Sequence, residues 1–250
     1  MVQHSLCPDD SSAPGTVNPR FAAVARDPRL IPGVHHYCDE WCHCCPVTQR
    51  CLAFRCIAEY RKQRGLADAE PTFSNMAEAI ALTREIAAVE GASTEDLDTI
   101  AAGSPGADAM HTQDPLAGVA LEYAFAVTRI LKPAPEDVSY WGAGTALPTP
   151  REVVIWHHLR IYLKLVRALV AKERTAASQV ERSEDAAGCA KLTLVSIARS
   201  RDALRALDEP SLHADIESLV SLLDAIEGGI DERFPEARAF IRVGLDVPAA

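Results

Sequence analysis

Apolar residues recur at helical spacing through most of the chain after residue 72. Between 74 and 90 they share one face at a period of about 3.6 residues, which predicts an amphipathic helix. A second apolar face begins at Leu116, directly after Asp114 and Pro115. Asp is a favoured N-cap and Pro is a favoured first helical residue, so we predict a helix over 115–131.

Three further helices are predicted downstream. The sequence Thr-Pro-Arg-Glu at 149–152 is a capping box with proline at the first helical position, and it predicts a long helix over 150–172. An aspartate at position 185 is expected to cap a helix over 185–207, and a last helix is predicted over 211–227. No alternating pattern typical of strands is present. We therefore predict an all-α protein with a helix bundle of about five long helices in a domain over 72–247.

The N-terminal part of the chain has a different character. Residues 1–30 contain prolines separated by Ser, Asp and Gly without a hydrophobic period, which predicts a mobile or loosely docked arm. Residues 31–66 form a small cysteine-rich segment, in which 52–64 is predicted to be a short helix closed by Gly65. The predicted architecture is a cysteine-rich, metal-binding segment that precedes the helix bundle.

Composition and charge limit the cellular compartments and the classes of binding partner that we expect. A formal net charge of −10 disfavours nucleic acid and anionic membranes as main partners. The sequence shows no secretory signal and no run of about 18 apolar residues, so we expect a soluble, cytoplasmic protein. Six of the eight cysteines fall between positions 38 and 56. In a reducing compartment, clustered cysteines are more often metal ligands or redox groups than disulfides.

Four of these cysteines have a spacing that suits a metal site. Cys38, Cys42 and Cys45 form a C-x3-C-x2-C run, and Cys51 adds a fourth thiol. Thiolates are the soft ligands preferred by zinc and by iron–sulfur clusters, and close spacing lets a short loop surround the metal. Three close cysteines with a fourth nearby suit a [4Fe–4S] cluster, and a proline directly after Cys45 is typical of ferredoxin-type runs. We therefore predict a [4Fe–4S] cluster on these four residues.

Zinc is the alternative metal. It usually binds two separated pairs of ligands, whereas no second pair is present outside this segment. Cys44 and Cys56 are less favoured ligands, because Cys44 adjoins another cysteine and Cys56 falls in the following helix, where a buried thiol fits. A histidine of the segment could complete a zinc site: His35, His36 or His43. Copper handling, a thiol–disulfide pair and the absence of a cofactor stay open. Cys7 and Cys189 are expected to play no part in the site.

The segment is similar to two groups of proteins. Its three-cysteine spacing resembles the cluster signature of radical SAM enzymes, but no series of βα units for their barrel is present, so we reject that assignment. The string from Tyr37 to Cys51, YCDEWCHCCPVTQRC, resembles the N-terminal signature of a group of uncharacterised bacterial proteins in which a helical domain follows the cysteines. Residues 185–191 and 197–200 are similar to the second half of that group. The resemblance implies the same four cysteine ligands and no particular activity.

The predicted helix over 150–172 carries a candidate anion contact. His158 lies at the edge of its apolar face, while His157 aligns with a basic stripe. That stripe consists of Arg160, Lys164 and Arg167. It can bind an anion or an acidic partner, or it can be a solvated face beside a core-edge histidine, and both interpretations stay open.

Arg201 is a second candidate anion contact. It projects from the middle of the apolar face of the predicted helix over 185–207. A buried guanidinium needs a negative partner, which is either a carboxylate from a neighbouring helix or a bound small anion.

The leading functional hypothesis is an iron–sulfur protein with a redox, electron-transfer or sensing role. The second is a structural-zinc module whose helices bind a partner protein, and the third is a protein that handles a soft metal. No Ser-His-Asp arrangement, P-loop or dinucleotide fingerprint identifies an enzyme. The partner is therefore an unidentified protein or small molecule.

Overall fold

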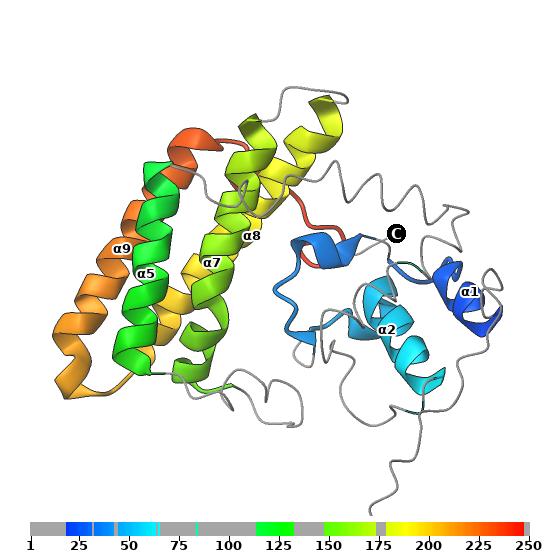
Figure 1. Ribbon diagram of the computed structural model, residues 1–250, viewed down its shortest axis with the longest axis horizontal. Helices are drawn as coiled ribbons and strands as arrows, with labels where there is room; N and C mark the ends of the chain where they lie inside the picture. The colour runs from blue at the N-terminus through cyan, green and yellow to red at the C-terminus, as the bar shows by residue number, and fades with distance from the viewer. Residues whose placement is uncertain are drawn as a thin grey trace, which may run out of the picture.

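The computed structural model describes residues 19–31, 33–42, 45–63, 65, 84, 114–132, 148–173 and 179–247. Its α-helices are α1 (Pro19–Ala25), α2 (Leu52–Gln63), α5 (Pro115–Leu131), α7 (Pro150–Glu173), α8 (Gln179–Ala206) and α9 (His213–Arg233). Short 3-10 helices are η1 (Val34–Tyr37), η3 (Thr48–Arg50), η5 (Pro210–Leu212) and η6 (Ala237–Ala239). Across these residues the regular elements are helices, with two isolated bridges, so the predicted all-α class is confirmed here (Figure 1). Of the predicted helix over 74–90, Arg84 is described and is helical, and the other residues lie outside the described part of the chain.

Helices α5, α7, α8 and α9 pack around one apolar core. The most extensive contact joins α7 to α8, α7 also packs against α5, and α9 packs against α5 and α8 (Figure 1). Fully buried aliphatic side chains fill the space between them, among them Ile161, Leu165, Ile197, Leu223 and Ile226. Each such side chain contributes about 1.5–3 kcal/mol relative to leaving it in water. No described helix is long and apolar enough to cross a membrane.

The starts of α5 and α7 agree with the sequence prediction. At α5, the Asp114 carboxylate accepts a hydrogen bond from the backbone N–H of Leu116 at 2.8 Å. At α7, the Glu152 carboxylate accepts from the backbone N–H of Thr149 at 2.6 Å and from its hydroxyl at 2.8 Å. Both caps satisfy polar groups that a helix end otherwise leaves without an internal partner.

The bounds of α8 and α9 correct the sequence prediction. α8 begins at Gln179, so Asp185 lies inside the helix instead of capping it. Its carboxylate binds the Arg167 guanidinium on α7 at 2.8 Å, and this tertiary ion pair replaces the expected cap. α9 begins at His213 and continues past Gly228 and Gly229 to Arg233.

The two glycines near the end of α9 differ in their surroundings. A Cβ at Gly229 would lie 2.4 Å from Cδ1 of Leu116, whereas nothing lies within 4 Å of one at Gly228. Gly229 therefore lets α9 approach α5 closely at the point where α5 begins. Packing against α5 stabilises the helix beyond the point at which consecutive glycines weaken it.

Residues 19–30, the end of the segment predicted to be a mobile or loosely docked arm, are described in part as helix. They contain α1, whose Phe21 is fully buried against Cys56 and Tyr60 of α2. Pro19 is the first residue of this short helix. Phe21, with Val24 and Ala25, packs it against α2. Residues 1–18 lie outside the described residues. α2 itself matches the predicted short helix, and Gly65 adopts the left-handed conformation after it, with φ of 67°.

We predict opposite effects of alanine at the two glycines of α9. Gly228→Ala is expected to stabilise the protein by about 0.5–1 kcal/mol, because alanine loses less backbone entropy in a helix. Gly229→Ala is expected to cost about 1 kcal/mol or more, because the new methyl group displaces Leu116. Urea unfolding followed by far-UV circular dichroism measures both. Equal effects at the two positions would contradict the close approach of α5 and α9.

Candidate metal centre

The loop that carries the cysteines is closed by local hydrogen bonds. The backbone N–H of Cys45 donates to the carbonyl of Cys42 at 3.2 Å, which makes a turn between these two residues. The Thr48 hydroxyl lies 2.5 Å from the Cys42 carbonyl and 2.8 Å from that of Cys45, so its hydrogen bonds stabilise the same turn. Cys51 follows η3 and directly precedes α2. The chain beside it is held by a bridge to Ile31.

The thiols of the four predicted ligands lie in one electrostatic neighbourhood. Burial raises the pKa of Cys38 to about 11, and the nearby Cys51 and Cys45 add to the rise. Burial likewise raises the pKa of Cys42 to about 12, with further contributions from the other three cysteines. Burial also raises the pKa of Cys51, and Cys45 contributes to that rise. The thiols of Cys38, Cys42, Cys45 and Cys51 therefore interact electrostatically with one another.

Backbone N–H groups point at two of the four sulfurs. The N–H of Glu40 donates to Sγ of Cys38 at 3.4 Å. The N–H of Phe54 donates to Sγ of Cys51 at 3.5 Å, and Ala53 adds a second backbone hydrogen bond. Cys51 therefore caps α2 with its sulfur, at the helix end where the dipole favours negative charge. These donors stabilise a thiolate, the form in which cysteine binds metal.

The four cysteines are soft donors of the kind that zinc and iron–sulfur centres take. Across the described residues, no three His, Cys, Asp or Glu side chains are arranged as ligands of one ion. The fold supplies four neighbouring soft donors, two of them with N–H partners, and metal binding would draw the sulfurs closer together. His43 and Cys44, two of the less favoured ligands, lie outside the described residues.

The residues between the cysteines hold the loop against the helices. We call residues 37–41 the docking strip. Tyr37 packs directly on the backbone of α8, because a Cβ at Gly188 would lie 2.2 Å from its ring. The Tyr37 ring also meets the edge of Phe240, with ring centroids 4.9 Å apart. Gly188 is thus the point at which the strip comes closest to α8.

Trp41 forms the second contact of the strip. It is 5% exposed and stacks on Trp156 of α7, with ring centroids 5.7 Å apart and planes 24° apart. The indole N–H of Trp156 donates to the Asp39 carbonyl at 2.9 Å. Aromatic pairs of this kind contribute about 0.5–1.5 kcal/mol beyond the area that they bury.

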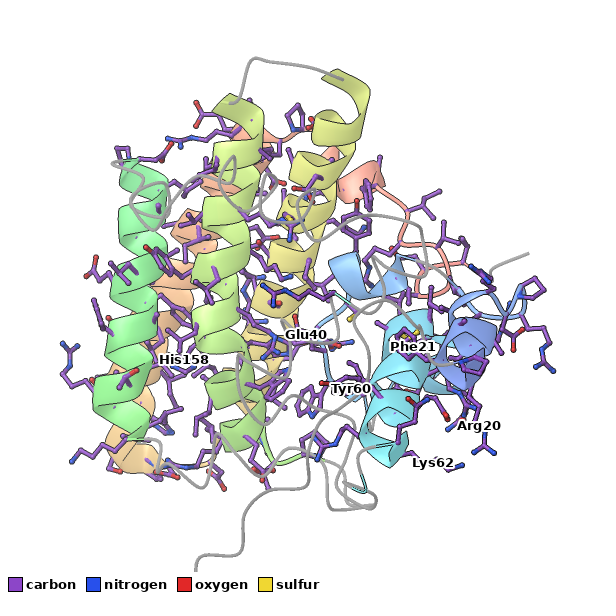
Figure 2. The ribbon with its side chains drawn as sticks, turned by 45° about the vertical axis from the view of Figure 1, so that its right-hand side comes forward. Arg20, Phe21, Glu40, Tyr60, Lys62 and His158 are labelled. Atoms are coloured by element: carbon purple, nitrogen blue, oxygen red, sulfur yellow. The ribbon has the colours of Figure 1, made fainter. Side chains whose placement is uncertain are left out.

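The acidic pair of the strip meets basic residues of the helices. Asp39 forms an ion pair with Arg199 of α8. Glu40 lies 2.6 Å from Arg160 and 3.9 Å from Lys164, both on α7 (Figure 2). Glu40 has a φ of 58°, in the left-handed region that non-glycine residues seldom adopt. Its two basic partners help to hold that conformation.

The basic stripe predicted on α7 is an interface. His157 is fully buried and packs edge-on against Trp41 at 5.7 Å. Arg160 lies over the Trp156 ring at 3.9 Å, and Lys164 pairs with Glu40. The placement of His157 on a solvated stripe is therefore wrong, because the docking strip covers that face of the helix.

The two candidate anion contacts hold protein partners. His158 is 5% exposed, and its Nδ1 lies 2.5 Å from the Ile155 carbonyl, so Nδ1 carries a proton and donates. The Arg201 guanidinium pairs with Asp224 at 2.7 Å and with Glu227, both on α9. For Arg201 the structure thus shows the carboxylate from a neighbouring helix that the sequence analysis left open.

The other described cysteines are buried in the packing of the helices, although Cys56 still interacts electrostatically with Cys51. Cys56 is 1% exposed between Phe21 and Tyr60. Cys189 is fully buried in α8, with Sγ 3.8 Å from the Asp185 carboxylate. Burial raises the pKa of both thiols to about 11. Both positions suit the small apolar role that a buried cysteine often has.

The comparisons with known proteins supply no relative. No family model matches the chain, and no curated protein and no solved structure matches it. The site is therefore interpreted from its own residues.

Sequence reasoning missed the docking strip as a functional element. Asp39 and Glu40 stand between two cysteines, and the 150–172 helix carries a basic stripe that lacked a partner. Matching these two charged patterns would have indicated the contact of Glu40 with α7. The aromatic contacts had no comparable signal, because stacking partners leave no fixed spacing in a sequence.

Alanine at Gly188 is expected to displace the docking strip from α8. The methyl group would overlap the Tyr37 ring, so hydrogen exchange of the backbone amides of residues 37–42 should accelerate while the core of α7 and α8 stays protected. Tyr37→Ala in the same protein serves as the control. If Gly188→Ala accelerates exchange equally in the Tyr37→Ala background, the close approach is not the cause.

His157 should make stability depend on pH. Burial, with a contribution from Arg160, lowers the pKa of His157 to about 3 from its ordinary value of 6.5. Below pH about 6.5 the unfolded chain therefore binds a proton that the folded chain does not. As the pH is lowered through this range, the free energy of unfolding decreases by up to about 1.4 kcal/mol per pH unit. Above that pH this contribution is complete.

Urea unfolding between pH 5 and 8 measures the slope, with His157→Leu as the comparison. In the variant, the slope of unfolding free energy against pH should be smaller by the amount that corresponds to about one bound proton. Identical slopes in the two proteins would mean that His157 titrates normally in the folded state.

Proposed function

We propose that the protein is a metal-binding, iron–sulfur protein in which Cys38, Cys42, Cys45 and Cys51 hold a [4Fe–4S] cluster with a redox, electron-transfer or sensing role. The observation that supports the proposal is the electrostatic interaction among these four partly buried thiols of one loop, two of which accept backbone N–H hydrogen bonds. A bound cluster would supply one-electron chemistry. The chain's own residues supply the thiolates, the N–H donors and the packing that shields them.

The shielding comes from the docking strip and its contacts. Trp41 is almost fully buried next to Cys42, and its stack on Trp156 closes one side of the loop. Burial and N–H donors to sulfur are two of the features by which a protein sets the potential of such a centre. The surroundings of these cysteines therefore suit a tuned redox site.

A structural zinc centre is the second candidate, favoured by the same strip. Asp39, Glu40 and Trp41 join the cysteine loop to α7 and α8, and a structural metal would keep that loop in shape. In that case the helices would present a surface to a partner protein. A carrier of soft metal has less support, because Cys56 is occupied in the packing of α1 on α2.

Metal analysis of protein purified without oxygen tests the proposal. We expect about four irons and four sulfides per chain and a broad absorption near 400 nm, as thiolate-bound iron–sulfur clusters give. A colourless protein with one tightly bound zinc would contradict the iron–sulfur proposal and support the second candidate.

Two variants test the ligand assignment. Cys42→Ser should abolish the metal content, because it removes a ligand from the centre of the loop. Cys189→Ala serves as the matched control, since this thiol is buried in α8, and it should keep the full metal content. Loss of metal in the control together with a native circular dichroism spectrum would overturn the assignment.

A further inference from the structure

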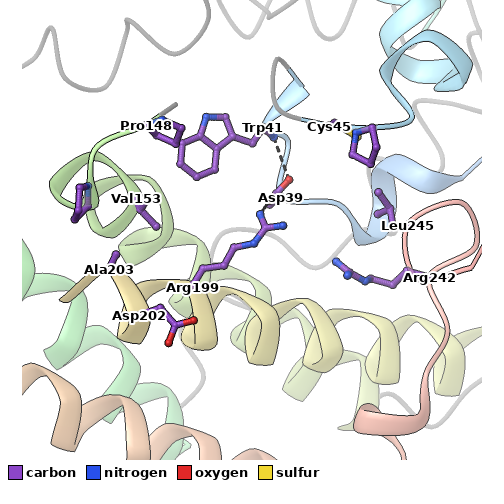
Figure 3. Close-up of a pocket in the computed structure, with 12 residues that line it drawn as sticks. Asp39, Trp41, Cys45, Pro148, Val153, Arg199, Asp202, Ala203, Arg242 and Leu245 are labelled. Atoms are coloured by element: carbon purple, nitrogen blue, oxygen red, sulfur yellow. Dashed lines mark hydrogen bonds and ion pairs between the residues drawn. The ribbon is translucent and has the colours of Figure 1, made fainter. Parts of the chain in front are cut away.

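A cleft of about 500 Å³ opens between the cysteine loop and the helices (Figure 3). Trp41 and Cys45 line it from the loop, and Arg199 lines it from α8. Arg242 and Leu245 line it from the segment that follows η6. Its volume lies in the range of small-molecule sites, about 300–1,000 Å³.

Two guanidinium groups from separate elements face this space. Figure 3 shows the side chains of Arg199 and Arg242 both directed into the cleft. The charge of Arg242, after the effect of burial, lowers the pKa of Arg199. Two cations held this near one another form a preorganised site for a negative group.

Both arginines have hydrogen-bond donors to spare. Arg199 meets Asp39 through Nη1, and Arg242 meets Asp246 through Nε and Nη2. The remaining N–H groups of the two side chains have no protein acceptor among the described residues. An anion between them would therefore gain new bonds without breaking either ion pair.

The rest of the lining decides which anion fits. Asp39 and Asp202 offset the two arginines within the lining, and Asp246 pairs with Arg242 from beside it. These carboxylates repel a dianion about twice as strongly as a monoanion, so of the two a monoanion fits better. The remaining surface is largely apolar, with Trp41, Val153, Ala203 and Leu245.

We propose that this cleft binds a small monocarboxylic acid with an apolar body, its carboxylate between Arg199 and Arg242 and its apolar part against Trp41 and Leu245. The site does not depend on the metal centre. If the cysteines hold a cluster, Cys45 places the bound acid beside it.

Isothermal titration calorimetry of the full chain with hexanoate tests the proposal, with hexanamide and inorganic phosphate as comparisons. Hexanoate should bind at least about tenfold more tightly than hexanamide, because the amide lacks the charge that the arginines recognise. Phosphate should bind more weakly than hexanoate. No heat with hexanoate at millimolar concentration, or tighter binding of phosphate, would overturn the proposal.

Arginine variants locate the site. Arg242→Gln and Arg199→Gln should each weaken hexanoate binding by about tenfold or more. Arg238→Gln is the matched control, because Arg238 pairs with Asp231 and Glu227 and does not line the cleft, and it should leave the affinity unchanged. An equal loss in the control would place the binding elsewhere. The same titration of Cys42→Ser separates this proposal from the proposed function, since binding should persist without metal.

Discussion

The stack of Trp41 on Trp156 joins the two parts of this molecule. Trp41 belongs to the cysteine loop, and Trp156 belongs to α7, the helix that packs most extensively against α8. The same contact buries His157 and aligns the Trp156 indole with the Asp39 carbonyl. Removing it would expose one face of α7 and leave the loop held by Tyr37 on α8 and by ion pairs, which contribute little when water reaches them.

Residues 37–42 alternate between cysteines and residues that contact the helices. Cys38 and Cys42 face the other thiols, while Tyr37, Asp39 and Trp41 face the helices. The left-handed conformation of Glu40 makes this division possible, because it turns the chain between Asp39 and Trp41. The residues between the cysteines thus contact α7 and α8 directly, while the cysteines themselves alternate with them along the chain.

Charged residues also join the cysteine loop to the helices. Arg160, Lys164 and Arg199 form a basic surface on α7 and α8, and the strip brings Asp39 and Glu40 to it. Arg199 and Arg242 both line the cleft beside Cys45, each with a carboxylate partner, Asp39 and Asp246.

The sequence by itself determined the helices with strong local signals. The caps at Asp114 and Thr149 and the helix after Cys51 all depend on residues a few positions apart, which a sequence displays directly. Tertiary structure decided the rest. α8 starts before Asp185, and α9 passes through Gly228, because packing between helices outweighs local caps and breakers. The burial of His157 and the docking of Tyr37 on Gly188 join positions more than a hundred residues apart, and such contacts leave no periodic trace in a single sequence.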